Sequence, residues 1–173
     1  MSTLGHVAVG MACGRAFSTK ETTARRAAVA FTLISLWPDI DVIGFPLGIG
    51  YAEPLGHRGA THSLALAAFV GLAAYAYAQR RGLAAKRVAI FATIAAASHG
   101  LLDTMTYGGG LGCALLWPLS DARFWAPIRF IPIAPIGLGL ISARGAMVML
   151  TELVIFTPFW LYALWPRRKT KPD

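Results

Sequence analysis

The sequence predicts an all-α protein, a bundle of about five helices that crosses a membrane several times. Hydrophobic residues make up 56% of the 173-residue chain, and charged residues make up only 14%. This composition supplies more apolar surface than the core of a soluble domain of the same length would need. The apolar runs alternate with short polar or basic stretches, as membrane spans alternate with turns. We expect a single domain over residues 1–173.

The first two helices are expected to be short. Residues 4–17 are apolar and contain Gly10 and Gly14 four positions apart, a spacing that lets helices approach closely in lipid. A second apolar run should end at Pro38, because the residue before a proline avoids helical geometry. Each helix would be about 20 Å long, shorter than the roughly 30 Å hydrocarbon core of a bilayer. Asp39 and Asp41 would then lie below the headgroups, in a recess lined by protein.

Three further helices are expected after an irregular, glycine- and proline-rich connection over residues 42–56. The third helix should cover residues 61–78, or begin at residue 63, and the fourth should run from about 88 to 106 before a stop at three glycines. Residues 107–143 are rich in glycine and proline but too apolar for a solvated linker, so they should form a long outer loop that folds over the site. The fifth helix should cover about 145–165.

Basic residues between the helices predict how the bundle is oriented. If there are five spans, all three basic groups lie on one side of the membrane, and the excess of Lys and Arg makes that side cytoplasmic. The net charge of +8 then serves orientation, and nucleic acid is not an expected partner. The three groups are Lys20, Arg25 and Arg26; Arg80, Arg81, Lys86 and Arg87; and Arg167, Arg168, Lys169 and Lys171.

This topology brings all four histidines and three aspartates of the chain to the outer face, where they predict a metal centre. Imidazole nitrogen and carboxylate oxygen are ligands for hard and borderline metal ions. Seven ligands exceed the three or four of one zinc ion, so we expect two or three divalent ions, with zinc the first choice and manganese or iron also compatible. The expected ligands are His6, Asp39, Asp41, His57, His62, His99 and Asp103.

Three residues are candidates for catalytic roles. Arg58 can clamp a phosphate with its planar guanidinium, although an arginine at this depth can also snorkel to the headgroups. Glu152 is an acid inside an apolar helix, where an ionisable group is usually functional. The alternative to a catalytic role is an ion pair of Glu152 with Arg144 or Arg129. One of the aspartates, such as Asp41, or Glu152 would act as general base.

Four motifs of the chain resemble those of the YdjM-like family of membrane-bound, metal-dependent hydrolases. They are GHVAVG at 5–10, LWPDID at 36–41, GHRGATHS at 56–63 and SHGLLD at 98–103. That family is grouped with zinc-dependent phospholipase C and P1-type nucleases. The resemblance implies an all-helical protein of the bacterial inner membrane, a zinc cluster held by His and Asp, and hydrolysis of phosphoesters.

The expected function is therefore hydrolysis by a metal-activated water at the outer, periplasmic face of the membrane. That position favours membrane lipids as partners and a lipid or lipid-linked phosphate as substrate. A non-hydrolytic metal-binding protein or a transporter linked to protons or cations is the alternative, because acids and histidines inside a bundle also serve such pathways. A third reading is a metal that only holds short helices together. The oligomeric state stays open.

Overall fold

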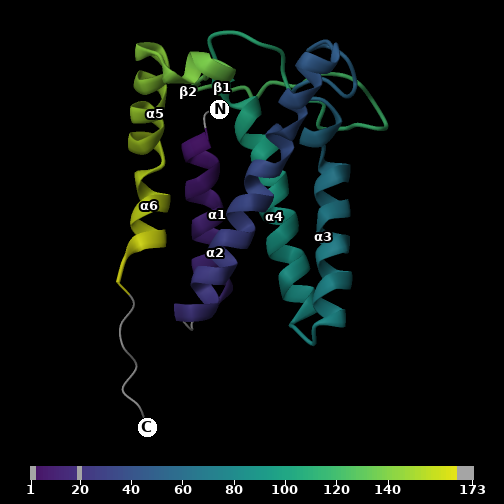
Figure 1. Ribbon diagram of the computed structural model, residues 1–173, viewed down its shortest axis with the longest axis vertical. Coiled ribbons are helices and arrows are strands. Elements are labelled where there is room, and N and C mark those ends of the chain that lie inside the picture. Colours follow the sequence, from purple (N-terminus) through teal and green to yellow (C-terminus); the bar gives the residue numbers. More distant parts are fainter. Residues whose placement is uncertain (1–2, 19–20, 167–173) are drawn as a thin grey trace.

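The computed structural model describes residues 3–18 and 21–166, which form a mostly helical bundle (Figure 1). Six α-helices lie in the described part of the chain, together with three 3₁₀-helices (η) and two short strands. The α-helices are α1 (Thr3–Phe17), α2 (Glu21–Leu36), α3 (Leu64–Arg80), α4 (Ala85–Thr104), α5 (Ala143–Ile155) and α6 (Thr157–Leu164). The other elements are η1 (Trp37–Leu47), η2 (Ala60–His62), β1 (Thr106–Tyr107), β2 (Ile131–Pro132) and η3 (Gly137–Ile141).

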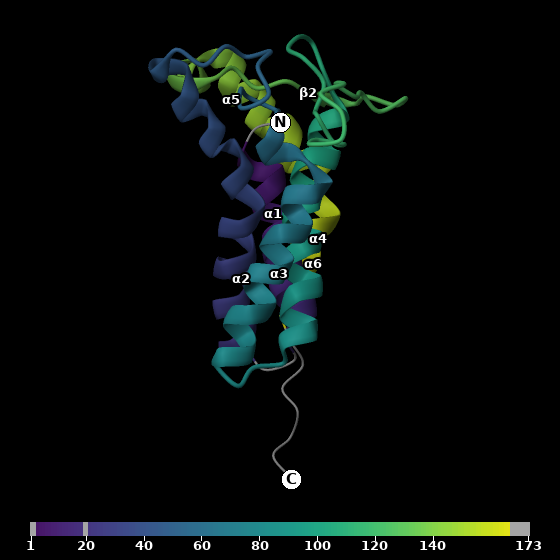
Figure 2. The same cartoon turned by 90° about the vertical axis from the view of Figure 1, so that its right-hand side faces the viewer.

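Helices α1 to α4 run along the long axis of the molecule and alternate in direction (Figures 1 and 2). The first residues of α1, the end of α4 and the segments η1, β1 and β2 all lie at the upper end. The end of α1, the start of α2 and the turn between α3 and α4 lie at the lower end. Helices α5 and α6 flank α1 on its outer side. The predicted up-and-down order of helices is therefore confirmed.

Glycines allow α1 and α2 to pack against each other without intervening side chains. A Cβ atom on Gly10 would collide with the backbone of Thr32, and one on Gly14 would collide with the backbone of Ala28. The close approach predicted from the spacing of the two glycines is confirmed, and its partner is α2. This contact ties the helix that carries His6 to the helix that leads to Asp39.

Three of the predicted helices differ in extent from those of the structure. The α-helical geometry of α2 ends at Leu36, but the chain continues as the 3₁₀-helix η1 to Leu47, so the prediction of an irregular segment from residue 42 is wrong up to that point. Pro38 is tolerated because it lies in the first turn of η1, where a missing N–H breaks no helical hydrogen bond. The predicted fifth helix is two helices bent by 65°, and Pro158 lies in the first turn of the second, α6. Helix α4 spans residues 85–104 and is shifted toward the N-terminus.

The loop over residues 107–143 packs against the upper end of the bundle, as expected for an outer loop. Its strand β2 pairs in parallel with β1, with Thr106 beside Ile131. Backbone hydrogen bonds join Ala114 N to Arg58 O at 2.9 Å and Leu64 N to Leu115 O at 3.0 Å. Arg123 donates to the carbonyl oxygens of His57 and Tyr51, at 2.9 and 3.2 Å. The loop therefore fixes the segment that contains the HRGATH sequence.

Apolar side chains cover the outside of the bundle, and polar groups fill its upper interior. The exposed residues include Leu33, Phe69, Leu72 and Leu150, which are each more than 60% exposed. By length and composition, one helical stretch of the described chain, 23–47, can cross a membrane, and the bent pair α5 and α6 is a second candidate. Helices α1 and α3, of 15 and 17 residues, are shorter than the roughly 20 residues of a standard span.

Candidate metal centre

Four separate segments place their ionisable side chains together at the upper end of the bundle. Helix α1 carries His6, and η1 carries Asp39 and Asp41. The loop before α3 carries His57 and His62, and the last turns of α4 carry His99 and Asp103. All are buried except Asp39, whose side chain is 31% exposed. The structure thus brings together all seven residues that the sequence predicted as ligands.

The first group that could hold a metal ion consists of Asp39, His62, His99 and Asp103. One ligand atom from each lies within 4.8 Å of those of the other three. His99 Nε2 is 3.3 Å from Asp39 Oδ1, and His62 Nε2 is 3.7 Å from Asp103 Oδ2. Two imidazoles and two carboxylates make up the number and type of ligands in a four-coordinate zinc site.

Hydrogen bonds outside this group orient both imidazoles. His99 Nδ1 lies 2.6 Å from the carbonyl oxygen of Ser35, which can only accept, so His99 carries its proton on Nδ1. His62 Nδ1 lies 3.2 Å from Asp41 Oδ2 and 3.0 Å from Thr61 Oγ1, while Thr61 donates its own proton to Asp41 at 2.7 Å. His62 is therefore also a donor at Nδ1. In metal sites, such contacts aim the Nε2 lone pair at the ion.

The two Nε2 atoms then face each other at 3.0 Å. Lone pairs at this distance repel unless a cation lies between them, either a proton or a metal ion. Two nitrogens bound to one tetrahedral zinc at about 2.05 Å would be roughly 3.3 Å apart, close to the observed separation. Burial alone would lower the pKa of His62, but the Asp103 and Asp41 carboxylates raise it above its ordinary value. The site therefore favours positive charge.

His6 extends the group on the side of α1. Its ring stacks on that of His99 with centroids 3.6 Å apart, and its Nε2 is 3.5 Å from Asp103 Oδ1. Both ring nitrogens are buried, and neither has a hydrogen-bond partner among the described residues. Buried polar atoms nearly always have a partner, so an orphaned imidazole beside a carboxylate fits a metal ligand.

The second group that could hold a metal ion consists of Asp41, His57 and His62. Asp41 Oδ1 is 2.7 Å from His57 Nδ1, and Asp41 Oδ2 accepts hydrogen bonds from Thr61 Oγ1 and from Arg58 N, at 2.7 and 3.1 Å. With His62, four neighbours contact this carboxylate, about as many as a carboxylate has lone-pair sites. Asp41 is therefore a hub that orients its neighbours, and it joins the two groups through His62.

Arg58 lies inside the centre, so its predicted alternative of snorkelling to the headgroups is wrong. Its side chain is 1% exposed, its Nε is 3.0 Å from Asp103 Oδ2, and its Nη1 donates to Thr106 Oγ1 and to the carbonyl of Leu111. The backbone of Arg58 is left-handed, with φ of 63°. Such strain in a non-glycine residue is held by surrounding contacts and is common at functional sites. Burial would lower the pKa of Arg58, but the charge of Asp103 raises it.

Glu152 is buried on α5. Its Oε2 accepts a hydrogen bond from the backbone N–H of Gly5 at 2.9 Å, and neither potential metal group includes it. Gly5 precedes His6 and lies in the first turn of α1, where N–H groups lack helical partners. The structure therefore places Glu152 where it caps the helix that carries His6.

Comparison with known proteins assigns the chain to a family. The family described as YdjM inner membrane protein matches residues 1–169. The chain belongs to this family. It is also 37% identical over 171 residues to the inner membrane protein YbcI of Escherichia coli (strain K12), and the match covers 95% of this chain and 96% of that protein. No solved structure matches the chain. The resemblance drawn from the four motifs is confirmed.

The YdjM-family chain also contains site residues that its sequence did not predict. Thr61 fixes the tautomer of His62, and its place within HRGATHS is a signal that could have found it. Ser35 orients His99 through its backbone carbonyl, and no feature of the Ser35 side chain predicts this contact. Trp125 lies beside Arg58, with the guanidinium carbon 5.5 Å from the ring centroid. Beside these groups lies a pocket of about 460 Å³.

Proposed function

We propose that this protein is a membrane-embedded, metal-dependent hydrolase that cleaves a phosphoester in a lipid or lipid-linked phosphate. The observation that carries the proposal is the pair of imidazoles of His62 and His99. Their Nδ1 atoms face hydrogen-bond acceptors, and their Nε2 atoms converge at 3.0 Å beside two carboxylates. Membership in an inner membrane protein family supports the location.

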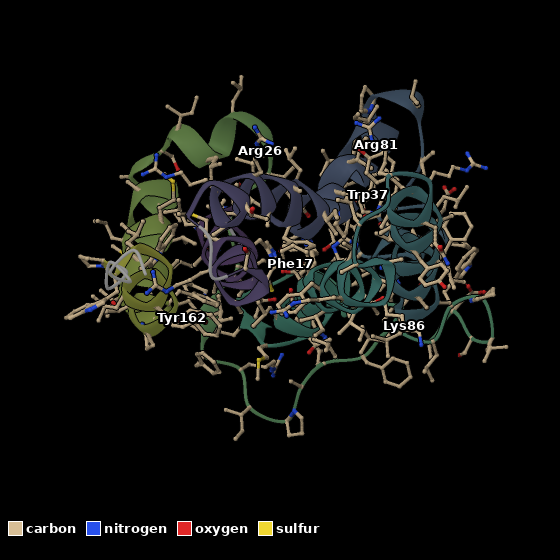
Figure 3. All side chains as sticks on the ribbon, turned by 90° about the horizontal axis from the view of Figure 1, so that it is seen from below. Phe17, Arg26, Trp37, Arg81, Lys86 and Tyr162 are labelled. Atoms are coloured by element: carbon tan, nitrogen blue, oxygen red, sulfur yellow. The ribbon has the colours of Figure 1, made fainter. Side chains whose placement is uncertain are left out.

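The distribution of charge supports a centre that faces outward. The described basic residues of the predicted cytoplasmic side lie at the lower end of the bundle, opposite the His and Asp cluster. Figure 3, seen from below, shows Arg26, Arg81 and Lys86 around Phe17 at this end. The proposal includes five crossings, with α5 and α6 as one broken span. The other basic residues of the predicted cytoplasmic side lie outside the described residues; they are Lys20, Arg167, Arg168, Lys169 and Lys171.

The residues of the centre have distinct roles in the proposed reaction. Asp39, His62, His99 and Asp103 would hold one divalent ion, and His57 and His6 would extend the site toward a second or third. Bound divalent ions lower the pKa of a water and polarise a phosphoryl oxygen. Arg58 stabilises the negative charge that develops on the phosphoryl group. Asp39 lines the pocket and is the most exposed acid of the cluster, so the carboxylate oxygen that it would not offer to the ion is well placed to accept a proton from water.

The apolar core below the cluster argues against the transport alternative. Ala8, Val9, Phe31, Ala92 and Ala95 pack together beneath the histidines and are all buried. A path for protons or cations toward the lower end would need polar groups or water there. A purely structural metal is the second alternative, and the open pocket beside Asp39 and Arg58 favours catalysis over it.

Elemental analysis together with turnover tests this proposal. The detergent-purified protein should contain two or more equivalents of zinc, manganese or iron, and the double variant His62→Ala with Asp103→Ala should lose them. The metal-loaded protein should hydrolyse a water-soluble phosphodiester, and the double variant should not. Absence of metal after reconstitution with zinc and manganese would overturn the metal centre. Bound metal without turnover of any phosphoester would overturn the hydrolase and leave a structural or transport role.

A further inference from the structure

The pocket beside the metal centre is lined by polar and apolar residues that come from different segments of the chain. The polar lining residues that belong to the cluster or contact it are Asp39, His57 and Arg58, and we call them the polar end of the pocket. We call the apolar lining residues its apolar end. The apolar residues come from η1 and from the segment between β2 and η3, and they extend onto η3 itself. They are Val42, Ile133, Ala134, Pro135, Ile136 and Leu140. A ligand that fills this space must itself be amphiphilic, with its polar group toward the cluster.

Three consecutive glycines form another wall of the pocket. Gly108, Gly109 and Gly110 have φ values of 97°, 138° and 73°, which side-chain-bearing residues rarely adopt. A Cβ atom on Gly110 would lie 2.9 Å from Ile133 Cδ1, so a side chain there would crowd the apolar end. A Cβ atom on Gly109 would meet nothing within 4 Å. The glycines therefore leave the space beside the centre unfilled by side chains.

Arg58 gives the polar end its preference for an anion. Its Nε and Nη1 contact Asp103, Thr106 and the carbonyl of Leu111. Its side-chain hydrogen bonds to described residues both come from Nη1, which leaves Nη2 available to a ligand, and Arg58 is one of the residues that line the pocket. A phosphate or phosphonate oxygen accepts from arginine in a charge-assisted hydrogen bond, and divalent ions in the cluster would add to this attraction.

We propose that this pocket binds a phosphoester that carries one hydrocarbon chain, with the phosphoryl group at Arg58 and the chain against Ile133, Ile136 and Leu140. The inference rests on the proposed function and specifies its substrate. The volume of about 460 Å³ lies in the lower part of the range of about 300–1,000 Å³ for small-molecule sites, which favours one chain over two. Lysophospholipids and polyprenyl phosphates share this chemistry.

Binding of alkylphosphonates tests the proposal without requiring turnover. The series from ethyl- to octylphosphonate would be titrated into the metal-loaded protein by calorimetry, with partition into detergent measured separately. Affinity should increase with chain length, by up to about fourfold per methylene. Ile136→Trp, which fills the apolar end, should lower octylphosphonate affinity by about tenfold or more, lower ethylphosphonate affinity much less, and leave the metal content unchanged. Leu138→Trp is the matched control, because Leu138 is 87% exposed and does not line the pocket.

Affinity that does not depend on chain length, or equal losses in the two tryptophan variants, would overturn the pocket assignment. Competition experiments then identify which class of phosphoester lipid binds in the pocket. Displacement of octylphosphonate by a lysophospholipid or by a polyprenyl phosphate supports the one-chain class and identifies its member, whereas equal displacement by a diacyl phosphatidic acid overturns it. Chain-dependent binding without any hydrolysis overturns only the proposed function. Hydrolysis of a water-soluble phosphodiester without chain-dependent binding overturns only the pocket.

Discussion

Arg58 Nε lies 3.0 Å from Asp103 Oδ2, and both side chains are almost completely buried. This pair places a permanent cation inside a cluster that is otherwise made of imidazoles and carboxylates. A buried charge that loses its partner costs about 3–5 kcal/mol of stability. The ion pair therefore stabilises the metal-free centre, and it competes with metal ions for the same carboxylate.

Replacement of Arg58 by glutamine should destabilise the metal-free protein and make zinc a stronger stabiliser. In Arg58→Gln, the buried Asp103 charge has no guanidinium beside it, so the free energy of unfolding should fall by about 3–5 kcal/mol. Zinc at Asp103 would replace that charge, so the melting temperature should rise more on zinc addition than in the wild type. Circular dichroism melts in detergent measure both effects. Arg26→Gln is the control, because Arg26 is exposed at the lower end; equal zinc shifts in all three proteins would contradict the prediction.

Single substitutions should separate the two groups of ligands. His57 belongs only to the group around Asp41, and His99 belongs only to the group around Asp39 and Asp103. His57→Ala should lose one equivalent of metal and keep the other, whereas His99→Ala should lose the ion held between the two Nε2 atoms. Metal-to-protein ratios from elemental analysis measure this. Loss of all metal in His57→Ala would show that the groups form one inseparable site.

Metal binding should weaken as the pH falls. A proton and a metal ion compete for the position between His62 and His99, and a histidine must be neutral to bind a metal. The Asp103 and Asp41 carboxylates raise the pKa of His62 above its ordinary value, although burial acts in the opposite direction. The affinity should therefore be constant above this pKa and should fall as the pH decreases below it, and the fall should begin at a higher pH than for an ordinary histidine. Equilibrium dialysis with zinc from about pH 8 to about pH 5 measures the midpoint; constant affinity over this range would contradict the prediction.

The gathering of the seven candidate ligands could be predicted because the chain has few ionisable groups and the basic residues place these seven at one end. The positions of His99 and Asp103, four apart on a helix, also follow directly from helical geometry. The orienting contacts could not be predicted in this way. The Ser35 carbonyl is invisible to side-chain patterns, and the hub at Asp41 depends on a left-handed backbone at Arg58. The position of Glu152 inside an apolar helix predicts a functional role, but its contact with α1 could not be predicted because it depends on the packing of α5.

The helices could be predicted where an apolar run ends at a polar turn, as at both ends of α3. At the start of α3, the Ser63 side chain caps the helix by accepting a hydrogen bond from Leu66 N at 3.1 Å. The break between α5 and α6 could not be seen in hydropathy, because the apolar run continues through it. Pro158 is the signal that was available. The 3₁₀ geometry of η1 is equally hidden, since its residues are as apolar as those of a span.

Widening the contact between α1 and α2 should weaken the metal centre from a distance. Gly14→Leu would push the Leu side chain into the backbone of Ala28, and overpacking typically costs about 1–3 kcal/mol. Because α1 carries His6 and α2 leads to Asp39, we expect a lower melting temperature and a lower zinc affinity. Ala30→Leu is the control, since Ala30 is exposed on α2. Unchanged zinc affinity in a clearly destabilised Gly14→Leu protein would show that the ligands do not depend on this contact.

Glutamine at position 152 should separate a positioning role from acid–base chemistry. Glu152 Oε2 accepts from the N–H of Gly5, next to His6, and an amide oxygen can accept the same hydrogen bond. Glu152→Gln should therefore retain metal and lose less than about fivefold in kcat/KM, which corresponds to less than about 1 kcal/mol. Glu152→Ala leaves the buried N–H without this partner, and should cost about 1–3 kcal/mol of stability together with metal affinity. If Glu152→Gln instead loses turnover about a hundredfold or more with its metal intact, Glu152 acts as the general base, because only the carboxylate can take up a proton.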